Sequence, residues 1–251
     1  SREAARPQRA WRNVPLRSRA PSARAPAHRA RDNTLRAGMP PAVGVQQDFQ
    51  SLVLACNKDG MDALRQGQSN AAFEQFKYAE AILISNQAEG DNANLLAVTC
   101  NNLGCYYKKV GKFHGALSYL RRALKMEVEL NTDEVTLAGT HLNICAILSK
   151  LEKHEKAVQH ALSALDLIKA RVSAQPEKVP VDDYSVLAIA YHNVAVERDF
   201  LRQYDQAAVA FKEGYQVARQ GLGEDHPLSV ALGKNCDAVL EKTRKPGRAP
   251  P

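Results

Sequence analysis

The chain has 251 residues, of which 45% are hydrophobic and 24% are charged, as in ordinary globular domains that build a core. No apolar run approaches the roughly 20 residues that a membrane-spanning helix needs, so the sequence argues against membrane insertion. The five cysteines are odd in number and scattered through helical pattern, which argues against a disulfide scaffold and for reduced thiols in a cytoplasm-like compartment.

The net charge of +7 belongs to the N-terminal segment. Residues 1–38 hold ten arginines and two acidic residues, a net charge of +8, which leaves −1 for the remaining 213 residues. This Arg-, Ala- and Pro-rich composition predicts that residues 1–45 are disordered, and we expect the same of residues 246–251. The prolines argue against the amphipathic helix of a mitochondrial import signal. The abrupt change of composition at Met39 leaves two interpretations open: translated upstream sequence or a fragment boundary, or else a disordered extension without a function.

From residue 46 onward, apolar residues recur at steps of three and four, which predicts helices throughout residues 46–245. Four segments of this region align with one another at offsets of 44, 41 and 50 residues, namely 58–83, 101–124, 141–165 and 192–215. We expect each to be one helix-turn-helix unit. Residues 228–245 continue the pattern as a lone first helix with a basic end, as expected of a cap that closes a solenoid.

Small residues recur at equivalent places in these units and predict where the helices cross. They are Gly60, Gly104, Cys145 and Ala195 in the first helices, and Ala72, Ala116, Ala157 and Ala207 in the second helices. A small side chain at a crossing lets two helices approach to 8–10 Å. Between the two helices of a unit, Gly67 and Gly111 suit a left-handed turn residue. The longest break is 173–183, and Asp225 and Pro227 are expected to cap and to begin the last helix.

The pattern L-G-x-x-Y followed by A-x-x-x-F-x-x-A resembles the tetratricopeptide repeat family, and GEDHP at 223–227 resembles repeats of the kinesin-light-chain type. The resemblance implies an all-α, right-handed solenoid of four helical pairs plus a C-terminal capping helix. It also implies a non-catalytic adaptor or scaffold, whose groove holds an extended peptide or a partner helix. By analogy, the setting is the cytoplasm, in cytoskeletal or ciliary assembly.

One asparagine recurs in each first helix, directly before an apolar residue, at Asn102, Asn143, Asn193 and Asn235. A side-chain amide both donates and accepts hydrogen bonds, so it can bind the N–H and the C=O of an extended peptide. In the resembling family such asparagines grip peptide backbone; the alternative is that each one bonds the neighbouring repeat. Further candidates for peptide contact, by their places in the first helices, are Asn101, His192, Lys58, Lys108, Lys109 and Lys150. The lysines would favour an acidic peptide.

The sequence predicts no enzymatic activity, cofactor or metal. The stretch 104–112 has no Ser or Thr after Lys112 and is not a phosphate-binding loop. His154 and His160 are six residues apart, on different faces of a helix, and cannot share a metal. Two other functions stay open, a helical-repeat protein that binds RNA with the help of its basic N-terminal tail, and a purely structural subunit of a complex. The −1 charge of the repeat region disfavours RNA binding.

Overall fold

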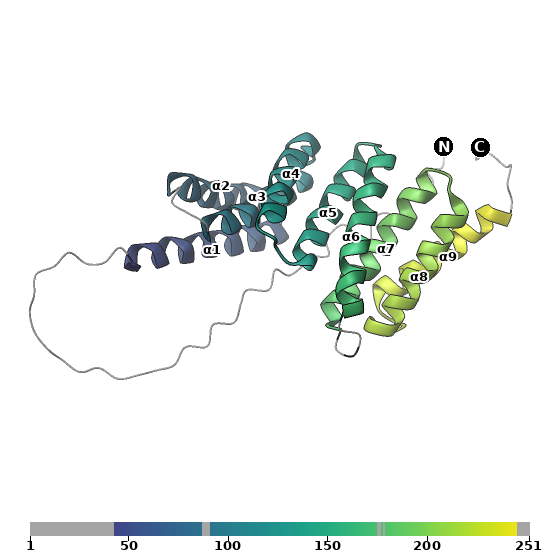
Figure 1. Ribbon diagram of the computed structural model, residues 1–251. Helices are drawn as coiled ribbons and strands as arrows, with labels where there is room; N and C mark the ends of the chain where they lie inside the picture. Colours follow the sequence, from purple (N-terminus) through teal and green to yellow (C-terminus); the bar gives the residue numbers. More distant parts are fainter. Residues whose placement is uncertain (1–42, 87–90, 175–176, 178, 245–251) are drawn as a thin grey trace, which may run out of the picture. The chain divides into compact units, whose positions relative to one another are not determined.

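The computed structural model describes residues 43–86, 91–174, 177 and 179–244, and these residues form nine α-helices and no strand (Figure 1). None of the described helices has the length and apolar character that crossing a membrane requires. The helices are α1 (Val43–Arg65), α2 (Ser69–Ser85), α3 (Asp91–Lys109), α4 (Phe113–Glu129), α5 (Glu134–Lys150), α6 (His154–Ala174), α7 (Val181–Phe200), α8 (Tyr204–Leu222) and α9 (Pro227–Arg244).

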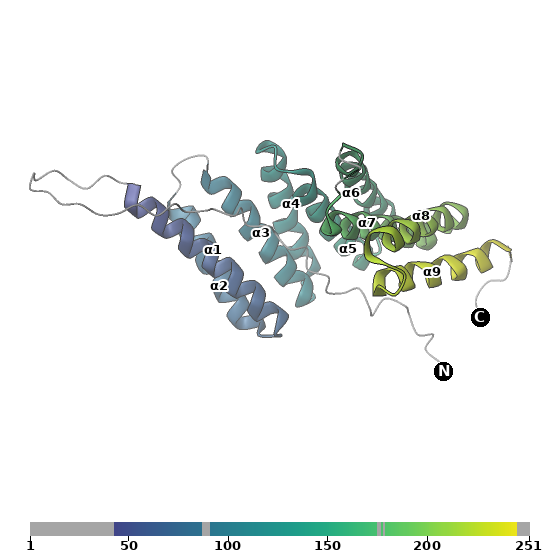
Figure 2. The same ribbon diagram turned by 90° about the horizontal axis from the view of Figure 1, so that it is seen from below.

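Each helix packs against the next one along the chain, in four pairs followed by α9 (Figures 1 and 2). The first helices of the repeats, α1, α3, α5 and α7, also contact one another in succession, and α7 contacts α9 in the same way. These five helices form a continuous surface, the first-helix face. The predicted all-α solenoid of four helical pairs and a final helix is confirmed.

The element boundaries differ from the predicted ones in three places. Residues 43–45, which the sequence assigned to the disordered tail, belong to α1. Helices α6 and α7 extend into the predicted break at 173–183 from both sides. Pro227 begins α9 as predicted, but the expected cap Asp225 lies one residue too early, and the imidazole of His226 accepts the Leu228 N–H instead, at 3.2 Å. The predictions for residues 1–42 and 246–251 fall outside the described residues.

The small residues at the helix crossings lie where the sequence placed them. A Cβ atom on Gly60 would come within 2.5 Å of the Phe76 ring, and one on Gly104 within 2.6 Å of Leu120 Cγ. Phe76 and Leu120 are fully buried, so neither has space to withdraw. The glycines of the first two repeats therefore permit a contact between first and second helices that a larger residue would prevent.

The turns inside the repeats share one backbone conformation. Gly67 and Gly111 have φ of +82° and +79°, as predicted for left-handed turn residues, and in the third and fourth repeats Glu152 and Arg202 adopt φ of +58° and +59°. In each turn the next residue donates its N–H to a carbonyl of the last helical turn, as in Lys112 N–H to Tyr107 O at 2.9 Å. The left-handed residue thus closes the first helix in all four repeats, whether or not it is glycine.

A buried glutamate replaces a core residue at the joint between the second and third repeats. Glu127 is 1% exposed, and its equivalents at the repeat offsets are the buried residues Leu83, Ile168 and Ala218. Its Oε1 accepts a hydrogen bond from Thr140 of α5 at 3.0 Å, whereas its Oε2 is buried without a partner among the described residues. Burial raises the pKa of Glu127 to about 7; the hydrogen bond from Thr140 lowers this pKa, and the Asp133 carboxylate raises it further.

Substituting Gly104 with Ala is expected to lower the free energy of unfolding by roughly 1–3 kcal/mol, because the new methyl group overlaps Leu120. The matched control is Gly115→Ala on α4, where a Cβ would lie 3.4 Å from the Tyr107 ring in ordinary contact. The control should be neutral, or more stable by up to about 1 kcal/mol through helix propensity. Urea denaturation measures both, and equal effects of the two substitutions would contradict close packing at Gly104.

Substituting Glu127 with Gln is expected to stabilise the protein by roughly 2–3 kcal/mol at pH 8 and by little at pH 5. The folded chain holds the proton of Glu127 up to about pH 7, whereas the unfolded chain releases it near pH 4.5. The folded state therefore binds more protons in this window, and its stability falls as the pH rises through it. Gln keeps an acceptor for Thr140 but carries no charge. Urea denaturation of both proteins at the two pH values tests this, and a pH-independent difference would show that Glu127 does not titrate.

Candidate functional site

The four repeated asparagines occupy the same register on the first-helix face. At the repeat offsets, Asn102 is equivalent to Lys58, Asn143, Asn193 and Asn235. The residue directly before each one is equivalent as well, and these residues are Asn57, Asn101, Leu142 and His192 in the first to the fourth repeat. We call a hydrogen bond a rung when it runs from the repeated asparagine of one repeat to this preceding residue of the repeat before it.

The first rung links α3 to α1. Asn102 donates from Nδ2 to Asn57 Oδ1 at 2.8 Å. Asn57 is 5% exposed and donates in turn to Val53 O at 3.0 Å and to Thr99 Oγ1 at 2.9 Å. The Thr99 hydroxyl donates to Leu95 O at 2.8 Å. Every polar atom of the Asn57 side chain therefore has a partner, and Asn102 supplies the one that its oxygen needs.

The second rung links α5 to α3 and engages both ends of one amide. Asn143 donates from Nδ2 to Asn101 Oδ1 at 3.3 Å, and its own Oδ1 accepts a hydrogen bond from Lys108 Nζ at 3.0 Å. Asn101, Asn143 and Lys108 thus form one inter-repeat network.

The last rung links α9 to α7 through a histidine. Asn235 Nδ2 lies 3.4 Å from His192 Nε2, and His192 Nδ1 lies 3.4 Å from Asn193 Oδ1. Burial lowers the pKa of His192, and its hydrogen bond to Asn193 only partly opposes this, so the ring is neutral near pH 7. The tautomer that satisfies both contacts accepts from Asn235 at Nε2 and donates to Asn193 from Nδ1.

The rung between the third and fourth repeats is missing. The residue that should accept from Asn193 is Leu142, whose side chain has no polar atom. The oxygen of Asn193 is used by His192, but its Nδ2 donates to no described residue. The four asparagines thus share one register in the first helices, and three of them, Asn102, Asn143 and Asn235, bond to the neighbouring repeat.

A strip of mostly small, uncharged side chains runs beside the asparagines, one turn further along each first helix. At equivalent places it contains Met61, Cys105, Ala146 and Val196, which are half-buried, and the exposed Ala238 of α9. The strip and the asparagines together give the first-helix face amide groups next to apolar surface. Such a combination suits an extended chain that offers backbone polar groups and short apolar side chains.

The predicted lysines differ in their surroundings. Lys58 of α1 and Lys150 of α5 have exposed side chains. Lys108 is bound to Asn143, and Lys109 Nζ donates to the Leu64 carbonyl of the preceding repeat. Two of the four lysines, Lys108 and Lys109, therefore bond between repeats in this way, which reduces their availability to an acidic peptide.

Two histidine contacts elsewhere in the described residues also lie between helices. His141 Nδ1 and His160 Nδ1 are 3.0 Å apart, and burial together with the neighbouring His160 lowers the pKa of His141 to about 4, so His141 is uncharged near neutral pH. His154 Nδ1 lies 2.7 Å from the buried Glu197 carboxylate, across the joint between the third and fourth repeats. Within the described part of the chain, no three His, Cys, Asp or Glu side chains are arranged to hold a metal ion.

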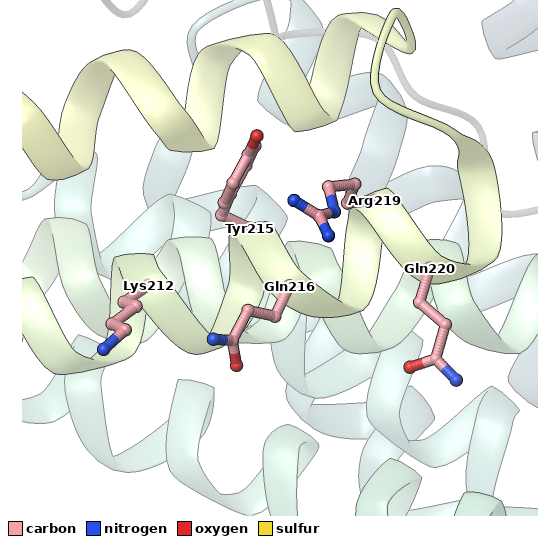
Figure 3. Close-up of a pocket in the computed structure, with 5 residues that line it drawn as sticks. All are labelled: Lys212, Tyr215, Gln216, Arg219 and Gln220. Carbon is pink, nitrogen blue, oxygen red and sulfur yellow. The ribbon is translucent and has the colours of Figure 1, made fainter.

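A hollow of about 570 Å³ lies away from the first-helix face, along α8 (Figure 3). Its lining residues all come from this one helix, and Figure 3 shows Tyr215 pointing toward α9 while Lys212 and Gln216 point away from it. Of these residues, Lys212, Gln216, Arg219 and Gln220 are exposed and Tyr215 is half-buried, so no buried polar group fixes a ligand there. The first-helix face is the better candidate.

Sequence reasoning missed two residues on which the site depends. Asn57 lies in the position of Asn101 and accepts from Asn102, and Leu142 lies in the same position and removes one rung. Both were visible in the repeat alignment, in the column directly before the repeated asparagines. This column holds a hydrogen-bonding side chain in the first, second and fourth repeats, and the apolar Leu142 in the third repeat.

Residues 96–133 match the tetratricopeptide repeat family, and they span most of α3 and all of α4. Among curated proteins, the chain is 25% identical over 152 residues to the Tonsoku-like protein of Mus musculus. This alignment covers 59% of the chain and 10% of the relative, so the chain spans about a tenth of that protein's length.

Solved structures resemble the chain in fold. The apo form of RapI has a TM-score of 0.63 at 16% identity, over 76% of this chain and 64% of that one. Repeats of a putative kinesin light chain from Podosopora anserina have a TM-score of 0.58 at 12% identity, over 76% and 92% of the two chains. The solenoid of paired helices is therefore shared with both.

The rungs predict a difference in stability between two equivalent substitutions. Asn102→Ala leaves Asn57 Oδ1 buried without its donor and should lower the free energy of unfolding by about 1–2 kcal/mol. Asn193→Ala removes no bond to another repeat and should change it by less than about 0.5 kcal/mol. Thermal and urea unfolding of the two variants measure this. Equal losses would mean that the Asn102 rung contributes nothing beyond an ordinary surface amide.

Proposed function

We propose that this chain, which is built of tetratricopeptide repeats similar to those of kinesin light chains, is a non-catalytic adaptor that binds a segment of another protein on its first-helix face. The repeat architecture supports a binding role, because stacked repeats give a long surface from a short chain. The observation that carries the proposal is the row of amides beside an apolar strip on that surface, formed by contiguous helices. The partner segment is extended, or is a helix that lies along the same face.

The chemistry of the face supports a partner that is recognised through its backbone and short apolar side chains. Amide groups bind peptide N–H and C=O groups without regard to sequence, and the strip of Met61, Cys105, Ala146 and Val196 offers shallow apolar contact. The exposed Lys58 favours an acidic residue at one flank of the segment. Peptide contact by the asparagines that form rungs would have to use amide atoms that the rungs leave over, or would have to break a rung.

The setting that we propose for this adaptor is the cytoplasm, in cytoskeletal or ciliary assembly. What supports it is the likeness of the solenoid to kinesin light chain repeats, which is a likeness of fold. Sedimentation of the chain with assembled microtubules and with isolated axonemes tests the setting. Its failure would leave the adaptor function intact, because that function rests on the first-helix face.

The adaptor function is tested by placing an arginine on the apolar strip. Ala146→Arg, at the middle of the strip, should abolish capture of partner proteins from a cytoplasmic lysate, because the long charged side chain occupies the face. The matched control is Gln220→Arg on the exposed surface of α8, which adds the same charge and should leave capture unchanged. Helical circular dichroism and melting establish that each variant is folded.

Ala238→Arg is a second strip variant at an exposed position of α9, where the added side chain has no core to disturb. Undiminished capture by both folded strip variants would contradict the proposed function. Capture of RNA instead of protein, with a steep dependence on salt, would favour the nucleic-acid alternative.

A further inference from the structure

Glu127 lies in the last turn of α4, at the joint between the second and third repeats. Its backbone carbonyl accepts the N–H of Thr132 at 3.0 Å, in the turn that leads to α5, and its side chain is 1% exposed. Its equivalents in the other second helices are the apolar residues Leu83, Ile168 and Ala218. A carboxyl group is therefore buried where the other repeats have hydrocarbon.

The packed joint satisfies this carboxyl group only in part. Thr140 of α5 donates to its Oε1 at 3.0 Å, whereas its Oε2 is buried without a partner among the described residues. A protonated Glu127 leaves one hydroxyl group without an acceptor. An ionised Glu127 leaves a buried charge without a cation, which costs more free energy, so the packed joint favours the protonated form.

The charges around Glu127 act in the same direction. The titratable groups that interact with it are the Asp133 carboxylate, from the turn between α4 and α5, and the Cys100 thiol of α3. Burial raises the pKa of Cys100 to about 11, so this thiol is uncharged near pH 7, and the C-terminal end of α4 disfavours a negative charge. Among the described residues, the Thr140 hydrogen bond lowers the pKa of Glu127, and no lysine, arginine or histidine does. Burial is the largest cause that raises this pKa, to about 7.

The first helices on the two sides of this joint hold it together weakly. Helices α3 and α5 are the least closely packed of the successive first helices. Their polar link is the rung from Asn143 to Asn101 at 3.3 Å, with the bond from Lys108 to Asn143. Separation of α4 from α5 would bring water to Glu127 Oε2 while both helices stay folded.

We infer that the joint between the second and third repeats is a proton-operated hinge, in which ionisation of Glu127 shifts the joint from a closed to an open state. In the open state water solvates Oε2, the bonds from Thr140 and Asn143 across the joint break, and the first-helix face is interrupted between α3 and α5. Each repeat stays intact, because crossings such as that of Gly104 with Leu120 hold its two helices together. The hinge goes beyond the proposed function and does not depend on a partner.

Opening of the hinge increases as the pH rises. The closed joint keeps the proton of Glu127 up to about pH 7, whereas a hydrated Glu127 releases it near pH 4.5. The closed state therefore binds more protons in this window, and the equilibrium constant for opening rises through the window and levels off above it. Between pH 6 and pH 8 this constant rises about ten-fold.

The test places one buried thiol in each of two joints of the full chain. Leu103 packs on Leu64 and Phe76 of the first repeat, and Ile144 is its equivalent in the third repeat; both side chains are 0% exposed. Ile144→Cys therefore reports on the hinge, and Leu103→Cys on the joint between the first and second repeats. Each variant reacts with iodoacetamide at pH 6 and at pH 8, and mass spectrometry measures the rate at the introduced cysteine. Division by the rate in the urea-unfolded chain removes the pH dependence of the thiol itself.

The hinge predicts that the rate ratio at Ile144→Cys rises about ten-fold from pH 6 to pH 8, and that at pH 8 it exceeds the ratio at Leu103→Cys. Adding Glu127→Gln, which cannot ionise, should abolish the rise, and so should Glu127→Leu, which supplies the residue type of Leu83.

Three results would each overturn the hinge. Equal ratios at the two thiols at pH 8 would mean that only unfolding of the whole chain exposes them. A ratio at Ile144→Cys that does not rise with pH would show that the joint does not respond to protons. A rise that persists with both Glu127→Gln and Glu127→Leu would assign the response to another group.

Discussion

The structure depends on contact between repeats, because no single pair of helices covers its own apolar surface. Each first helix packs on its second helix through a small residue, as Gly104 does against Leu120, and the pair is then covered by the next repeat. Polar groups at these joints must be satisfied by the neighbouring repeat or lie open to water. The hydrogen bonds between first helices follow from that constraint, and so does the one place where such a bond is missing.

The joints are chemically different although the repeats are alike. The joint of the second and third repeats holds the buried carboxyl of Glu127 in a place that other repeats fill with apolar residues. The joint of the third and fourth repeats joins His154 to Glu197 and lacks the amide rung. Such substitutions weaken packing or remove a bond, and a repeat array keeps its fold because each joint is one of several nearest-neighbour contacts. A binding site can therefore arise at one joint without loss of the solenoid.

The sequence predicts the fold well because it repeats in register, and each column of the alignment reports one structural role. The crossing glycines and the left-handed Gly67 and Gly111 were predictable in this way, and the helix start at Pro227 followed from the preference of proline for the first helical position. The hydrogen-bond partners of the repeated asparagines were not predictable from the sequence. An amide bonds equally well to a ligand or to the next repeat, and only the geometry between repeats decides which of the two it binds. Glu127 was not predictable for a different reason. It lies in a column that is otherwise apolar, and the burial of its Oε2 without a partner follows only from the packing of the neighbouring helices.

Of the four repeated asparagines, Asn193 is the one that makes no hydrogen bond to a neighbouring repeat among the described residues. Hydrogen exchange of the asparagine side-chain amides in the free, ¹⁵N-labelled full chain measures this directly, since a hydrogen bond to a neighbouring repeat slows exchange. We predict that the Asn193 amide exchanges fastest of the four repeated asparagines, while Asn102 is protected by Asn57. Equal protection at Asn193 and Asn102 would mean that the missing rung is satisfied within the chain, which would contradict an unused donor at this joint.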